Sequence, residues 1–144
     1  MDSWEDLLAH VLLPVASEDD ARRTARTLSA YETGRITAFY VVEKGDGVPD
    51  KTPVDQSESV ASAAFEAVRA VFPDAETETA YAHHVVDTIL ETATEVGASA
   101  IVYRSRGGNR LLHFLSGDKT LKLATRSPVP VVALPLEESE EAGS

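Results

Sequence analysis

The residues best suited to chemistry lie in the last third of the chain, where glycines and basic side chains follow a short apolar run. Residues 100–103 lead into the pattern Arg104-x2-Gly107-x9-Gly117-Asp118, and a helical pattern then extends to residue 127. Loops that join a strand to a helix N-terminus bind phosphates in many α/β proteins, because the first N–H groups of a helix have no intrahelical partner. This stretch therefore predicts a site for an anionic ligand.

The charge of this stretch allows two interpretations. Residues 104–126 hold six of the 13 basic residues of the chain and one acid, a formal charge of +5 within a net charge of -11. In the first interpretation the stretch is an electropositive mouth, where Arg104 and Arg106 contact the anion because alternate residues leaving a strand can both reach a cleft. In the second it is a solvated face, since Lys119, Lys122 and Arg126 have the spacing of one helix stripe. The sixth basic residue is Arg110.

Other chemistries have little support. The chain has no cysteine, which excludes disulfides, thiol nucleophiles and thiolate metal sites. The Walker sequence of P-loop enzymes is absent, and no histidine stands in an orienting relation to Ser105 or Ser116. His83 and Asp87 lie one helical turn apart, but no third metal ligand accompanies them. We predict no catalytic residue, no metal site and no enzymatic activity.

The elements that must position the stretch alternate between strands and helices. We expect strands at 10–15, 36–42, 76–82, 98–103 and 129–135, and helices at 18–32, 57–71, 83–96 and 117–126. Continuous apolar strands separated by helices predict a doubly wound parallel α/β sheet. Ser17 is expected to cap the first helix and Gly34 to end it, while 43–56 is interpreted as a loop.

Composition limits the function classes. The 144 residues, 43% of them apolar, suit one domain over 1–136, followed by an acidic tail at 137–144 that we expect to be disordered. A dispersed acidic excess argues against nucleic-acid binding, and with only four lysines it is typical of salt-adapted, halophilic proteins. No apolar run is long enough to span a membrane, and the acidic N-terminus is unlike a signal peptide. We therefore expect a soluble, cytoplasmic protein.

Over about residues 8–136 the pattern resembles the universal stress protein family. That family has the signature Gly-x2-Gly-x9-Gly-(Ser/Thr), followed by a helix and a Pro-Val strand, and here Gly117 stands at a fitting distance from Pro130. The Leu-Leu-Pro-Val of 12–15 and the Tyr-Val-Val-Glu of 40–43 also fit. The resemblance implies a five-stranded, flavodoxin-like sheet of order 3-2-1-4-5. It also implies a homodimer, paired through the fifth strand at Val131–Leu134.

The resemblance implies as well where a nucleotide would bind. In nucleotide-binding members, ATP lies between the first and fourth strands and contacts an Asp that ends the first strand, a valine backbone in the second strand, and the glycine loop. Carried over, the site residues here are Val41, Arg104, Arg106, Gly107, Gly117 and Asp118. The chain departs from the pattern at three positions, because Ala16 replaces the Asp, Arg104 the first glycine and Asp118 the Ser/Thr.

Two functions remain open at this point. The first is the binding of a nucleotide, such as ATP, or of another phosphorylated metabolite at an altered site of a stress-response protein. The second is a dimeric interaction or regulatory protein that binds no nucleotide, in which Arg104 and Asp118 pair across the emptied site.

Overall fold

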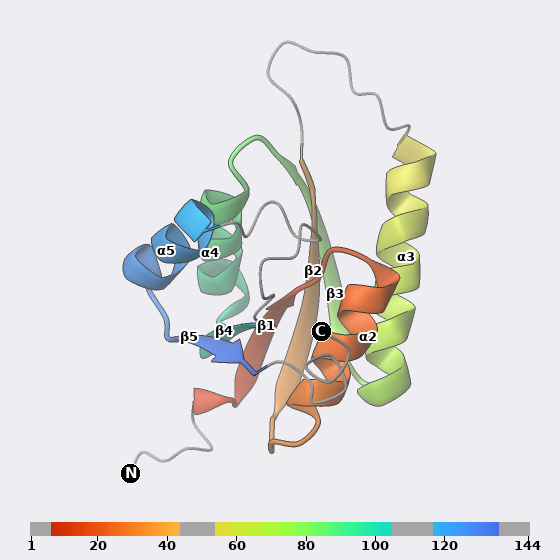
Figure 1. The fold of residues 1–144 in the computed structure, drawn as a ribbon, viewed down its shortest axis with the longest axis horizontal. Helices are drawn as coiled ribbons and strands as arrows, with labels where there is room; N and C mark the ends of the chain where they lie inside the picture. The colour runs from red at the N-terminus through yellow and green to blue at the C-terminus, as the bar shows by residue number, and fades with distance from the viewer. Residues whose placement is uncertain (1–6, 44–53, 105–116, 136–144) are drawn as a thin grey trace.

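The computed structural model describes residues 7–43, 54–104 and 117–135, which form one parallel sheet with helices on both faces (Figure 1). The elements are β1 (His10–Pro14), α2 (Glu18–Leu28), β2 (Arg35–Glu43), α3 (Val54–Val71), β3 (Glu76–Ala82), α4 (Val85–Val96), β4 (Ala100–Arg104), α5 (Gly117–Arg126) and β5 (Val131–Leu134). The strand order is β3-β2-β1-β4-β5, and every described pair is parallel. The predicted fold class and strand order are confirmed.

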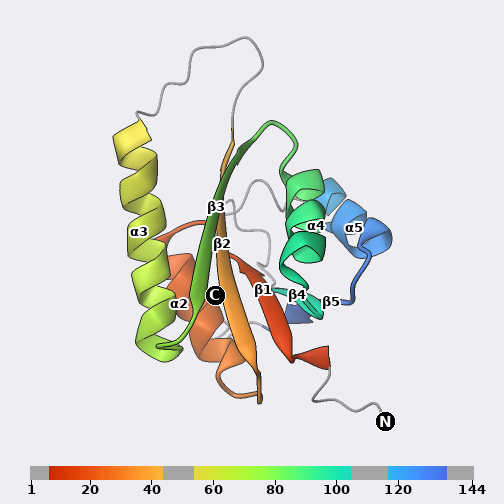
Figure 2. The ribbon, with the colours of Figure 1, turned by 180° about the vertical axis from the view of Figure 1, so that it is seen from behind.

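The two faces of the sheet have separate cores. Helices α2 and α3 cover one face and α4 and α5 the other (Figures 1 and 2). Side chains alternate along β1, so that Val11 and Leu13 pack on the α2–α3 side and Leu12 on the α4–α5 side. Because both faces are covered, all five residues of β1 are buried, and the strand is apolar after its first residue, His10.

The sheet reverses its direction of growth at β1. This strand pairs with β2 from His10↔Arg35 to Pro14↔Phe39, and on its other side it pairs with β4 at Val11↔Ala100 and Leu12↔Ile101. The helix that follows β1, α2, lies on one face of the sheet, and the helix that follows β4, α5, lies on the other. Such a switch point opens a crevice in which α/β proteins bind ligands.

Two glycines near helix ends have different roles. The prediction that Gly34 ends the first helix is wrong, because α2 ends at Leu28 and its C-cap residue, Ser29, is in the right-handed helical region. Gly34 is instead held close to β1, where an added Cβ would lie 2.3 Å from the carbonyl oxygen of Ala9. Gly97 does end a helix, α4, with a φ of 75° that favours glycine.

Other boundaries differ by a few residues from the prediction. Helix α3 begins at Val54, three residues before the predicted start, so the loop interpretation of 43–56 extended too far. Strand β3 lies at one edge of the sheet, as predicted, and β5 at the other. The predicted tail at 137–144 lies outside the described residues. In the described ranges, no helix combines the length and the apolar character that crossing a membrane requires.

Candidate functional site

The connection from β1 into α2 places an acidic side chain at the switch point. Ser17 is the N-cap of α2, as predicted, and its hydroxyl accepts a hydrogen bond from the Asp20 backbone N–H at 3.1 Å. Asp20 reaches back in return, and its Oδ2 accepts from the Ala16 N–H at 3.0 Å. This reciprocal capping satisfies two backbone donors at the start of the helix. It also fixes the orientation of the Asp20 carboxylate.

The second oxygen of that carboxylate faces Arg104. Arg104 Nη2 lies 3.9 Å from Asp20 Oδ1, and the two side chains are 2% and 0% exposed. The Thr24 hydroxyl lies 3.5 Å from the same Oδ1. Arg104 is the last residue of β4 and shares a sheet face with Val102, which packs on the α2–α3 side. The fold therefore buries a charge pair between α2 and the end of β4.

Val41 lies on the other face of the sheet. It is 7% exposed and packs with Leu12 and Ile101 on the α4–α5 side. The side chains of Val41 and Arg104 are thus not brought together, although both residues stand toward the carboxyl ends of their strands. Any ligand that contacts both must approach the Val41 backbone rather than its side chain.

The remaining predicted site residues are described only in part. Gly117 is the first residue of α5 and Asp118 the second. Arg106, Gly107 and the side chain of Asp118 lie outside the described part of the chain. The predicted pairing of Arg104 with Asp118 stays a prediction.

The positive charge of residues 104–126 is partly neutralised by acidic side chains from other elements. Besides the pairing of Arg104 with Asp20, Lys122 Nζ on α5 lies 3.2 Å from Asp87 Oδ1 on α4. Asp87 had been one of two possible metal ligands, and in the described ranges no three acidic or histidine side chains are placed to hold a metal ion. Of the three cations whose side chains the structure describes, Arg104 and Lys122 therefore have acidic partners. This reduces the positive field available to a free anion.

Asp20, one of three acids in the first turn of α2, was not identified from the sequence. A signal was present, because Asp20, Thr24 and Leu28 follow one another at intervals of four residues. In the structure all three are buried. An acid in line with the buried stripe of a helix needs a buried partner. The buried position of Asp20 therefore predicts a basic partner, such as a residue at the end of a neighbouring strand.

A second polar cluster lies at the other end of the strands, where β1, β2 and β3 begin. His10 Nε2 lies 2.9 Å from Thr37 Oγ1, and the Thr37 hydroxyl lies 3.4 Å from Glu76 Oε1. Arg35 Nη2 donates to the same Glu76 oxygen at 2.7 Å. Burial and, second, the charge of Arg35 hold the pKa of His10 below its ordinary value of 6.5. The hydrogen bond from Arg35 likewise holds the pKa of Glu76 below 4.5.

Comparison with known proteins assigns the fold to a family. Residues 8–135, nearly the whole chain, match the sequence pattern of the universal stress protein family. This chain belongs to the universal stress protein family. No curated protein matches it significantly.

Solved structures of other universal stress proteins share the fold. The protein from Archaeoglobus fulgidus in complex with dAMP has a TM-score of 0.65 and 18% identity, covering 89% of this chain and 98% of that one. A universal stress protein in complex with cAMP has a TM-score of 0.62 and 18% identity, with coverages of 90% and 98%. UspA from Lactobacillus plantarum has a TM-score of 0.61 and 23% identity, with coverages of 88% and 97%.

Proposed function

We propose that this universal stress protein binds a nucleotide or another phosphorylated anion at the switch point between β1 and β4, without catalysing a reaction. The observation that carries the proposal is the position of Arg104, a cation at the carboxyl end of β4 beside the start of α2. Relatives of the same fold have been solved with dAMP and with cAMP, which supports a nucleotide as the ligand.

The ligand would be recognised mainly through its phosphates. Ala16, at the position of the family's aspartate, has no side-chain acceptor for a base, and its N–H is already bonded to Asp20. Base recognition would therefore rest on backbone groups near Val41. We expect little discrimination between ATP and GTP, and measurable binding of inorganic pyrophosphate.

The first experiment is mass spectrometry of the protein as purified, to find any retained nucleotide. Calorimetric titrations with ATP, GTP and pyrophosphate in molar KCl then measure affinity. We expect Arg104→Lys, which keeps a charge opposite Asp20, to weaken ATP binding about tenfold, because an ammonium cannot form the forked bonds of a guanidinium. Arg126→Lys is the matched control, exposed in the last turn of α5. The absence of binding of all three ligands by the wild type, up to about 1 mM, would overturn the proposal.

The buried pair also favours a second candidate, a dimeric interaction protein that binds no nucleotide. Asp20 occupies Arg104 within the fold, as an internal substitute for a ligand would. Dimerisation through β5 is part of both candidates. The Ile101 N–H donates to the Pro130 carbonyl, so by strand alternation the backbone groups of Val131 and Ala133 face away from β4.

That geometry gives a direct test of the dimer. Ala133→Pro removes an outward N–H without removing a bond to β4, and it should convert a dimer into a monomer in light-scattering measurements. Ala133→Ser keeps the N–H and is the control. A wild type that is monomeric at all concentrations, or a proline variant that stays dimeric, would exclude pairing through β5.

A further inference from the structure

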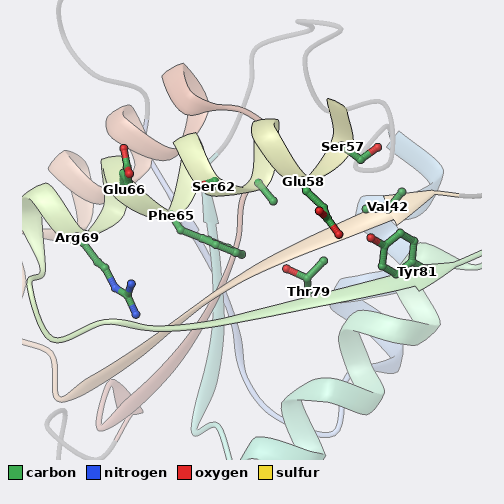
Figure 3. Close-up of a pocket in the computed structure, with 10 residues that line it drawn as sticks. Val42, Ser57, Glu58, Ser62, Phe65, Glu66, Arg69, Thr79 and Tyr81 are labelled. Carbon is green, nitrogen blue, oxygen red and sulfur yellow. The ribbon is translucent and has the colours of Figure 1, made fainter. Parts of the chain in front are cut away.

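A groove with a volume of about 410 Å³ lies between α3 and the edge of the sheet formed by β2 and β3 (Figure 3). It shares no residue with the Asp20–Arg104 pair, and its volume is in the range of small-molecule sites. The side chains that define it are Ser57, Glu58 and Phe65 from α3, and Val42, Thr79 and Tyr81 from the sheet.

The groove exists because α3 does not fully cover β3. None of the seven residues of β3, all of them described, is buried, and Tyr81 is 44% exposed on the side that faces the groove. Phe65 is half-buried and packs against the core on the α2–α3 side. An aromatic wall and an aromatic rim are therefore available to a flat ligand.

The polar groups of the groove are divided between its ends. Glu58 points toward Thr79 and Tyr81, whereas the carboxylate of Glu66 points away from the sheet (Figure 3). At the far end, Arg69 Nε donates to the carbonyl oxygen of Ala75 at 2.9 Å, which ties the guanidinium to the loop before β3. The Glu58 end thus offers a carboxylate and hydroxyl oxygens beside an aromatic ring.

We propose that this groove binds an organic cation, a primary ammonium group on a flat apolar body. The ammonium would lie between the Glu58 carboxylate and the face of Tyr81, where an ion pair and a cation–π contact act together. The apolar body would lie along Phe65, two helical turns away and about 10 Å along the axis. An arylethylamine is shorter than that axial spacing, but the Phe65 ring extends toward the Glu58 end of the groove (Figure 3), so a ring two methylene groups from the ammonium could contact it. The acidic charge of the whole chain also favours a cation.

Tryptamine is the probe, and indole-3-acetate, with the same ring and the opposite charge, is its counterpart. Titrations followed by amide NMR at fixed ionic strength should show tryptamine shifting the amides of α3 and β3, while indole-3-acetate leaves them unchanged. Glu58→Gln should weaken tryptamine binding about tenfold, the size expected for one charge-assisted hydrogen bond.

Glu66→Gln removes the same charge from the same helix and should leave the affinity unchanged. Phe65→Leu keeps an apolar side chain in the core and should weaken both the binding and the ring-current shifts. Equal binding of the two probes, equal effects of the two glutamine variants, or no shift with tryptamine would each overturn the proposal. ATP should not change the tryptamine affinity, so this result is independent of the nucleotide experiment.

Discussion

Two arginine–carboxylate pairs lie at opposite ends of the strands. The pair with the shorter distance between its charged atoms is expected to contribute less to stability, and the pair with the longer distance is expected to contribute more. At the amino-terminal ends of the strands, Arg35 Nη2 lies 2.7 Å from Glu76 Oε1, and the two side chains are 62% and 55% exposed. At the carboxyl ends of the strands, Arg104 Nη2 lies 3.9 Å from Asp20 Oδ1, and both side chains are almost fully buried. Two opposite unit charges 4 Å apart attract by about 1 kcal/mol in bulk water and about 4 kcal/mol at an effective dielectric constant of 20.

Burial, rather than the distance between the charged atoms, determines how much stability is lost when such a pair is broken. An exposed pair that is broken leaves each charge in water, where it is solvated. A buried pair that is broken leaves a charge without solvent or partner, and the folded state bears that cost in full. Breaking the Arg104–Asp20 pair, which has the longer distance, should therefore destabilise the fold more than breaking the Arg35–Glu76 pair.

The largest effect is expected from Asp20→Ala. This variant removes the partner of Arg104 and the acceptor of the Ala16 N–H, and it should lower the free energy of unfolding by about 3–5 kcal/mol. Urea denaturation measures the loss. Asp19→Ala is the control, because Asp19 lies in the same helical turn but is exposed and pairs with Arg22 and Arg23. It should lose no more than about 1 kcal/mol, and similar losses in the two variants would contradict the comparison.

Replacing both partners should restore most of that stability. In Asp20→Leu/Arg104→Met no buried charge is left, and apolar side chains of similar size fill the space, so the double variant should unfold within about 2 kcal/mol of the wild type. If it is no more stable than Asp20→Leu alone, the lost bond to Ala16 matters more than the ion pair. Nucleotide titration of the same variant then shows whether the pair is needed for binding.

The fold could be predicted because its determinants are local and repetitive. Continuous apolar strands and intervening amphipathic helices specify a parallel doubly wound sheet, and Gly97 marks a helix end through its own backbone conformation. Gly34 looked the same in sequence. Its role depends on the Ala9 carbonyl that β1 places beside it, which is a tertiary contact with no local signature.

The candidate site was less predictable for the same reason. Arg104 was recognised from the spacing of the glycine signature, but its partner, 84 positions earlier, looked like one of three acids at the start of a helix. The groove beside α3 left no trace in the sequence. It results from incomplete cover of an edge strand, and periodicity along one helix does not report how far that helix lies from the sheet.

The free energy of unfolding should depend on pH through His10, at the start of β1, and we expect this effect to be intermediate in size. The pKa of His10 in the folded protein lies below 6.5, the ordinary value that the unfolded chain has. The unfolded state therefore takes up this proton first as pH falls, and stability decreases from pH 6.5 down to the folded-state pKa. Urea denaturation between pH 7 and about pH 5, where most carboxylates remain charged, should show this slope. His10→Gln should flatten it, and an unchanged slope would assign the effect to other groups.

The smallest change in stability is expected from the exposed pair, and its clearest signal lies in the pKa of His10. Glu76→Gln and Arg35→Met should each shift the urea midpoint only slightly, and less in molar salt. The negative charge of Glu76 raises the pKa of His10 and the positive charge of Arg35 lowers it. In NMR titrations of the His10 ring, Glu76→Gln should therefore lower that pKa, while Arg35→Met should raise it. Shifts of the same sign in both variants would mean that rearrangement of the Thr37 hydrogen bonds, rather than charge, controls the ring.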